Sequence, residues 1–271
     1  MMETPEPASV PNAARAGRDN FDAHWLEAGA PAVHPNLRHL PMNEVEGSRA
    51  RISNPLSRAI VDHHAHRQRV ADRLQALGHE GASAYFLDEL PRNDRTRKGN
   101  FGEVVASEHL IQRYGYTMPV FKLRYRDSNL PMRGEDIVAF KIDDQQRITC
   151  VIIGEAKTIV TYSANTVRQA HERLKTAYHP RPMTLGMLAE ILYAMDNAPL
   201  ASQIDDIAVR LARDAFPREN WIFLFCQQCP ADPFACLNDN DSTIPGLHCV
   251  NLSLADLTAF VNRLFDHPVL E

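Results

Sequence analysis

Apolar residues recur at intervals of three to four positions over several stretches of the chain, which is the spacing of amphipathic helices. The first clear stretch covers residues 54–78, where Asn54 can cap a helix and Pro55 suits its first turn. A second stretch over 101–114 is followed by Gly115 at the C-cap position. Further helices are predicted over 82–89, 163–178, 184–196 and 200–215, and from a cap at Ser253 through Phe265.

Other stretches are continuously apolar and rich in β-branched side chains, which is typical of strands. The longest, RITCVIIGEAKT over 147–158, is apolar on both faces, as expected of a central strand. Further strands are predicted over 118–125, 136–142, 220–227 and 247–252. The order of helix, strands, helices, strands and helix predicts an α/β fold with a mixed central sheet flanked by helices.

Three regions follow one another along the chain. Residues 1–20 combine proline, alanine and polar residues without periodicity, so we expect a disordered lead-in. Residues 21–91 are expected to form a mostly helical N-terminal extension, in which 21–53 predict only one or two short elements. Residues 92–271 carry the succession of strands and helices of the main α/β domain.

The composition of the 271 residues is that of a globular protein, with 44% apolar and 23% charged side chains. No stretch approaches the roughly 18–20 apolar residues of a membrane helix, which excludes a transmembrane protein. The N-terminus lacks the pattern of a secretory signal. Five cysteines without framework spacing indicate reduced thiols, so we expect a cytoplasmic protein.

The net charge of −5 would by itself argue against a protein that binds nucleic acid. The charge is unevenly distributed, however. Residues 1–91 carry 9 basic and 12 acidic side chains (net −3), residues 92–182 carry 16 and 10 (net +6), and residues 183–271 carry 4 and 12 (net −8). A polyanion responds to charge within a Debye length of about 8–10 Å, so the middle third remains a candidate DNA-binding region.

The middle third also holds a group of residues that can carry chemistry. Glu155 and Lys157 end the central strand and project from one face about 6–7 Å apart. If the strands over 136–142 and 147–158 form a hairpin, Asp136 lies near Glu155. A third acid, Glu103, sits in the first turn of the preceding helix, where the helix dipole alone would also favour it. The competing acids are Glu108 and Glu135, and Glu135 should face away from Asp136.

A helix acid, then Asp, then Glu-X-Lys on the next strand resembles the PD-(D/E)XK nuclease superfamily. The resemblance implies a restriction-endonuclease-like fold and a Mg²⁺ site, with Mn²⁺ acceptable in its place. In that site Asp136, Glu155 and the carbonyl of Ala156 would bind the ion, and Glu103 would act through water or on a second ion. Lys157 would attend the attacking water. Gly-Glu stands before Asp136 where the superfamily has proline, which is not a ligand.

The runs KGNFGEVVASEHL, LRYRD, RGEDIVAF and IIGEAKT, within residues 95–175, narrow the resemblance. They are similar to the HamA family, the nuclease subunits of Hachiman anti-phage defence systems, and to the AbpA phage-resistance proteins. This likeness implies a DNA endonuclease under the control of a partner helicase of superfamily 2, HamB. Such restraint is expected, because an unrestrained nuclease would damage its host.

Two other functions stay open at this point. One is a stand-alone restriction or repair-type nuclease of the same superfamily, which would need its own sequence-reading region. The other is a catalytically silent scaffold that binds DNA or protein, which predicts a broken metal site. All four expected positions are filled here, which favours an enzyme. No Walker-type phosphate loop is present, so ATP hydrolysis is not expected.

Several further side chains are candidates for binding. The expected DNA contacts are Arg124, Arg126, Arg133, Arg168, Gln169 and Arg173. Zinc is an alternative for Cys226, Cys229, Cys236 and Cys249, with His248 as a substitute ligand, but the later spacings fit no standard zinc ribbon and favour buried thiols. His63, His64 and His66 lie on different faces of the predicted helix, which favours packing or solvation over metal binding.

Overall fold

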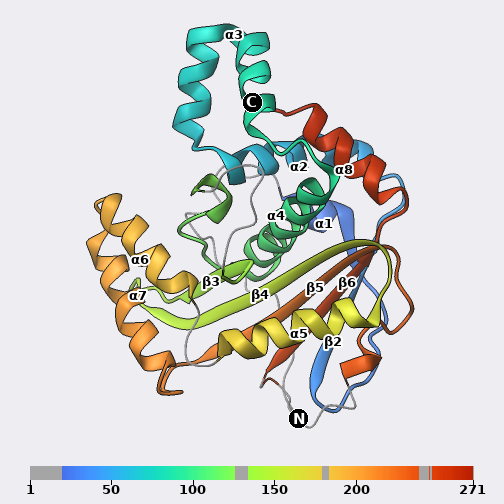
Figure 1. The fold of residues 1–271 in the computed structure, drawn as a ribbon, viewed down its shortest axis with the longest axis vertical. Helices are drawn as coiled ribbons and strands as arrows, with labels where there is room; N and C mark the ends of the chain where they lie inside the picture. The colour runs from blue at the N-terminus through green and yellow to red at the C-terminus, as the bar shows by residue number, and fades with distance from the viewer. Residues whose placement is uncertain (1–19, 126–133, 179–182, 238–243, 245, 271) are drawn as a thin grey trace.

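A computed structural model of the chain describes residues 20–125, 134–178, 183–237, 244 and 246–270. One six-stranded sheet runs through it in the order β1-β2-β6-β5-β4-β3 (Figure 1). The strands are β1 (Leu26–Ala28), β2 (Leu37–Glu44), β3 (Ile137–Ile142), β4 (Ile148–Thr161), β5 (Arg218–Gln228) and β6 (Leu247–Ser253). The two outer pairs, β1–β2 and β3–β4, are antiparallel, and the three inner pairs are parallel.

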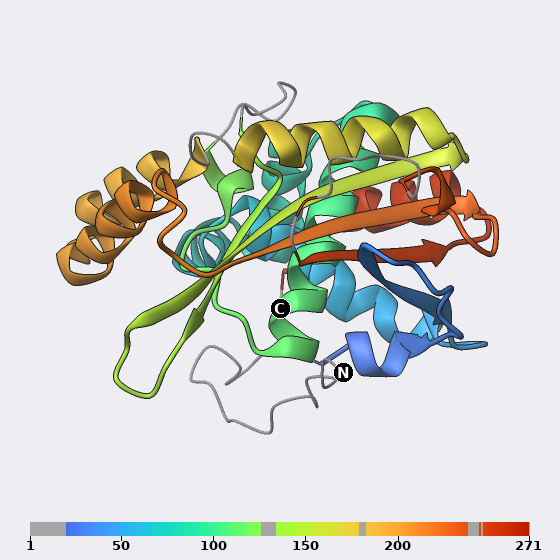
Figure 2. The same cartoon turned by 90° about the horizontal axis from the view of Figure 1, so that it is seen from below.

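Helices cover both faces of this sheet. One face packs against α1 (Asp22–Trp25), α2 (Arg49–His64), α4 (Asp94–Tyr114) and α8 (Leu257–Asp266). The other packs against α5 (Ala164–Tyr178), α6 (Thr184–Ala194) and α7 (Ala198–Leu211). Figure 2 shows α5 lying along one side of the sheet and α4 on the opposite side. The remaining α-helix of the described residues, α3 (Arg67–Glu89), stands away from the sheet (Figure 1).

The alternation of side chains along β4 explains the two apolar cores. Ile152 points to the α4 side, whereas Val151 and Ile153 point to the α5 side, and all three are fully buried. A strand of this kind must be apolar on both faces, which is the pattern that predicted it. The prediction of a mixed sheet flanked by helices is therefore confirmed. None of the helices within the described ranges is both long enough and apolar enough to cross a membrane.

The N-terminal region contributes strands as well as helices. β2 pairs in parallel with β6, so residues 37–42 lie beside residues 247–252. Trp25 and Leu56 are buried in the same core as α4 and α8. The region over 21–91, expected to be mostly helical, thus shares one sheet and one core with the rest of the chain.

The predicted helix starts need correction. α2 begins at Arg49, so Pro55 lies inside the helix and not in its first turn. α4 begins at Asp94 and not at residue 101, because the Asn93 side chain accepts a 2.8 Å hydrogen bond from the N–H of Thr96 and caps the helix there. The predicted end of α4 is confirmed, since Gly115 has a left-handed backbone with φ of 71°.

Two further predictions were wrong. Residues 118–125 do not form a strand. Thr117 makes a single bridge to Phe140, Pro119 then has no N–H to continue the pairing, and Lys122–Tyr125 form a 3₁₀ helix, η2. Ser253 does not cap α8 but ends β6, where its Oγ accepts a 3.0 Å hydrogen bond from the N–H of Cys229.

Candidate active site

The hairpin of β3 and β4 brings two carboxylates together. Ile137 pairs with Gly154 at the open end of the hairpin, so Asp136 and Glu155 come next on the two strands. Oδ2 of Asp136 accepts a 3.0 Å hydrogen bond from the N–H of Ala156. The side chain of Asp136 thus takes the place of a backbone partner where β3 has ended and β4 continues. The predicted meeting of Asp136 and Glu155 is confirmed.

Two cations converge on Glu155, which is only 2% exposed on the α5 side of β4. Lys157, two residues further along the same face, donates from Nζ to Oε1 of Glu155. Arg173 of α5 donates from Nη1 to the same oxygen at 2.8 Å. The side chain of Arg173 is itself 64% exposed, so its guanidinium reaches the buried carboxylate from the solvent side.

The surroundings of Glu155 favour its neutral, protonated form. Burial and the neighbouring Asp136 carboxylate raise the pKa of Glu155, and the opposing effects of Lys157 and Arg173 do not cancel that rise. The Glu155 carboxylate in turn raises the pKa of Arg173. Two carboxylates thus share a partly buried place, and a divalent cation bound there would favour their ionised forms.

Glu103 lies on the other side of β4. α4 approaches β4 closely at Gly102, where an added methyl group would lie 2.3 Å from Oγ1 of Thr158. This contact fixes the position of the next residue, Glu103, which lines a small pocket together with Asp136. Glu155, in contrast, faces α5 on the opposite side of β4. The structure therefore brings Glu103 and Asp136 to one pocket, and Glu155 is not among the residues that line it.

The two competing acids have other partners. Oε1 of buried Glu108 lies 2.8 Å from Nε2 of His63, and its other oxygen accepts a 2.8 Å hydrogen bond from Gln112. The carboxylate of Glu135 accepts hydrogen bonds of 3.2 and 3.0 Å from two backbone N–H groups at the start of α6. Glu108 thus ties α4 to α2, and Glu135 caps α6, whereas Asp136 alone turns toward β4.

The candidate DNA contacts differ in how free they are to meet a phosphate. Arg124 donates from Nε and Nη2 to one backbone carbonyl of α2, at 2.9 and 2.6 Å, and so links η2 to that helix. Arg168 and Gln169 are exposed on α5. Gln169 precedes Arg173 by one turn on the same side of the helix. The remaining two candidates, Arg126 and Arg133, lie outside the described residues.

The four cysteines considered as zinc ligands differ in their bonding. Cys226 and Cys229 are joined in a disulfide with a Cα–Cα distance of 5.6 Å. The expectation of reduced thiols is therefore wrong for this pair, while Cys150, Cys236 and Cys249 are free. Burial raises the pKa of Cys249 well above its ordinary value, which fits a thiol that packs in the core.

The three neighbouring histidines of α2 and its end have separate partners. Their ring nitrogens lie 2.7 to 3.3 Å from three different side chains, two on α4 and one on η2. The predicted packing role is confirmed for His63 and His64, which are hydrogen-bonded to side chains of α4. The pairs are His63 with Glu108, His64 with Asn100, and His66 with Tyr125.

A different group was missed by reasoning from the sequence. Within the described ranges, the one set of three His, Cys, Asp or Glu side chains whose ligand atoms all lie within 4.8 Å of one another is His34, His39 and Asp232. The three candidate acids Glu103, Asp136 and Glu155 do not form such a set. No sequence motif indicated this group, because its members come from a loop, from β2 and from a second loop far along the chain.

Comparison with known proteins gives two matches. A family model described as HamA matches residues 20–267. The Hachiman protein HamA of Bacillus cereus is 28% identical over 187 residues, which are 68% of this chain. The matched part spans 65% of the length of that curated relative.

Proposed function

The chain belongs to the HamA family, and on this premise we propose that it is a Mg²⁺-dependent DNA endonuclease with a PD-(D/E)XK-type site on β3 and β4. One observation carries the proposal: Asp136 lies beside buried Glu155, and Lys157 and Arg173 converge on the same carboxylate. The name of the curated relative supports placing this activity in a Hachiman-type anti-phage defence system.

The donor atoms of this site fit Mg²⁺. That ion is commonly held by one or two carboxylates and keeps several waters, so Asp136 and Glu155 suffice as its charged ligands. Burial and Asp136 raise the pKa of Glu155, and a bound cation would favour its ionised form. The carbonyl of Ala156 points to the same edge of β4 as the Ala156 N–H, which donates its hydrogen bond to Asp136. The carbonyl oxygen could therefore be a third ligand of the ion. Glu103 would hold a water or a second ion in the pocket that it lines together with Asp136.

Each remaining residue has a task that follows from its position. When bound, the ion neutralises the scissile phosphate and lowers the pKa of a bound water. Lys157 lies on the same strand face as Glu155, where its ammonium would orient that water and stabilise charge developing on the phosphate. Arg173 is mostly exposed, so it can leave Glu155 and pair with a phosphate oxygen.

DNA would approach along α5. Arg168 and Gln169 are exposed on this helix, and Arg173 follows one turn later at the edge of the site. These residues belong to the segment of net charge +6, whereas the flanking segments carry −3 and −8. Such a distribution attracts a polyanion to one region and repels it from the rest. The acidic flanks would suit a basic surface of a helicase partner of the HamB type.

Two ion pairs, one inside the proposed site and one outside it, allow a controlled test of catalysis. Glu155 with Lys157, both on β4, has a counterpart in Glu219 of β5 with Lys141 of β3, which lies away from the hairpin's open end. Glu155→Gln and Lys157→Ala should each lower Mg²⁺-dependent DNA cleavage by at least about 100-fold and abolish phage protection. Glu219→Gln and Lys141→Ala, with folding checked by circular dichroism, should leave both intact. Cleavage that survives in both site variants would end the proposal.

The partner is tested separately. The chain, co-expressed with a superfamily-2 helicase encoded beside it, should elute with that helicase in size exclusion. Glu155→Gln should leave the complex intact, because it removes a buried charge and no surface. Failure to form a complex, together with full cleavage by the isolated chain, would support the stand-alone nuclease instead.

A further inference from the structure

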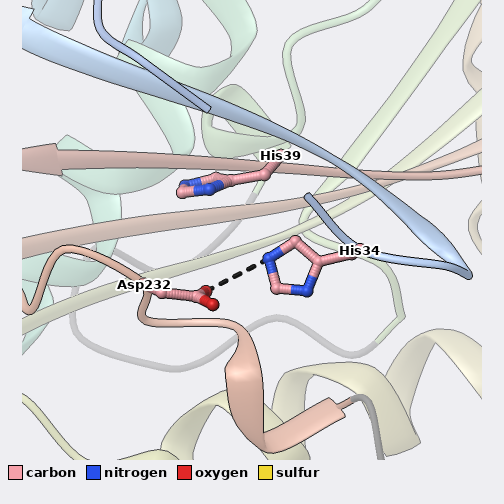
Figure 3. Close-up of side chains that lie close together, drawn as sticks. All are labelled: His34, His39 and Asp232. Atoms are coloured by element: carbon pink, nitrogen blue, oxygen red, sulfur yellow. Dashed lines mark ion pairs between the residues drawn. The ribbon is translucent and has the colours of Figure 1, made fainter. Parts of the chain in front are cut away.

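Three side chains from separate segments meet at the end of the sheet away from the β3–β4 hairpin (Figure 3). His34 belongs to the loop between β1 and β2, His39 to β2, and Asp232 to the loop that follows β5. Nε2 of His34 lies 3.2 Å from Oδ1 of Asp232, and one ligand atom from each of the three residues lies within 4.8 Å of the others. Donors this close can share one ion.

The ring of His39 is already oriented. Its Nδ1 accepts a 3.1 Å hydrogen bond from the N–H of Ala32, so the neutral ring carries its proton on Nε2, which lies 2.7 Å from Oδ1 of Asn251. Metal-binding histidines characteristically donate their second N–H to an oxygen of this kind, which fixes the ring for coordination. Nδ1 is then the ligand atom, and the Ala32 N–H must move aside. Val33, the residue after Ala32, is 97% exposed, so its side chain is not packed in a way that would oppose this movement.

The surroundings are also suited to an ion. The side chain of His34 is fully buried and His39 is 3% exposed, so the two imidazoles are shielded from bulk solvent. The ring of Phe234 stands edge-on to His39 at 5.4 Å between centroids. Asp232 is one-third exposed and provides the route from solvent.

We propose that His34, His39 and Asp232 bind Zn²⁺, with water in the fourth position. Two imidazoles and one carboxylate are ligands that Zn²⁺ accepts in tetrahedral geometry, whereas Mg²⁺ prefers an all-oxygen set. This ion differs from the one proposed for Asp136 and Glu155, and the inference does not depend on the nuclease proposal. By joining the 29–36 loop to the loop after β5, the ion would stabilise the β2–β6 side of the sheet.

The experiment is a Zn²⁺ titration of the full chain after treatment with EDTA. Isothermal titration calorimetry should show one Zn²⁺ per chain, insensitive to millimolar Mg²⁺, and thermal unfolding should shift upward with Zn²⁺. His34→Gln and Asp232→Asn should each weaken binding by at least about tenfold. The control His24→Gln replaces an exposed histidine and should bind normally.

Two further variants separate the alternatives. Glu155→Gln should leave Zn²⁺ binding unchanged, since that carboxylate belongs to the other site. Cys226→Ser with Cys229→Ser should also leave it unchanged. Asp232→Asn keeps the size of the side chain, so it tests the site even if His34→Gln unfolds the protein. No Zn²⁺ binding, or binding that depends on Glu155 or on the cysteines and not on Asp232, would overturn the proposal.

Discussion

Replacing Gly102 by alanine should lower the free energy of unfolding by about 0.5–2 kcal/mol. The added methyl group would lie 2.3 Å from Oγ1 of Thr158, a distance that cannot persist, and 3.5 Å from Phe225, which is an ordinary contact. Overpacking of this kind costs about 1–3 kcal/mol, and removing a glycine from a helix interior returns roughly 0.5–1 kcal/mol. Gly99, one turn earlier in α4, has no atom within 4 Å of an added methyl group, so Gly99→Ala should instead stabilise the protein.

Thermal unfolding followed by circular dichroism measures the difference. At roughly 2–4 °C per kcal/mol for a chain of this size, Gly102→Ala should lower Tm by about 1–8 °C and Gly99→Ala should raise it. Removing the obstructing hydroxyl should rescue the first variant, so that Gly102→Ala with Thr158→Ala is no less stable than Thr158→Ala alone. If Gly102→Ala raises Tm as Gly99→Ala does, α4 does not approach β4 as described, and the placement of Glu103 loses its basis.

Three other expectations concern single side chains. Glu135→Gln should lower the free energy of unfolding in urea by about 1 kcal/mol, because it weakens the cap of α6. It should leave Mg²⁺-dependent plasmid cleavage intact, whereas Asp136→Asn should abolish cleavage. Equal effects of the two variants on cleavage would contradict the division of roles between these acids. Burial lowers the pKa of His248 to about 4, so the unfolded chain binds a proton that the folded chain does not, and stability should fall as pH drops from about 6.5 to 4. His248→Gln should flatten that part of the curve, and an unchanged slope would show that another group is responsible. The raised pKa of Glu155 has the opposite effect on stability. The stability that protonated Glu155 contributes is present at low pH and is lost as the pH rises above 4.5, the ordinary pKa of a glutamate. Glu155→Gln should therefore gain stability over the wild type between about pH 4 and 7, and coinciding curves would argue against a raised pKa.

The central strands and the helices of the α5 side could be predicted because each carries its own local signal. β4 is a long run of β-branched residues, and the spacing across the DDQQ turn was enough to place Asp136 beside Glu155. Lys157 followed from simple alternation along the strand. The identities of the hairpin acids were thus accessible from the sequence, and the structure adds their partners and their burial.

What could not be predicted depends on contacts between distant segments. β2 is half-buried, contains Pro41 and gains its place only by pairing with β6, so nothing within residues 37–44 distinguishes it as a strand of the main sheet. The reach of Arg173 from α5 to Glu155 is likewise a tertiary contact. Glu103 shares a helix turn with apolar residues in the sequence, and only the packing of α4 shows on which side of β4 it lies.

The pairing of β2 with β6 has a consequence for the time course of folding. β2 is synthesised early, but its parallel neighbour β6 is the last strand of the chain, about 200 residues later, and the early helix α2 also receives contacts from the end of α8 through Ser57. At about 5–20 residues per second, β2 would stay unpaired on that side for roughly 10–40 s of synthesis. The hairpin that carries Asp136 and Glu155 emerges well before the sheet behind it can close. An incomplete chain therefore holds the proposed catalytic residues without the framework that positions them, and long-range pairing of this kind also predicts a slowly folding protein.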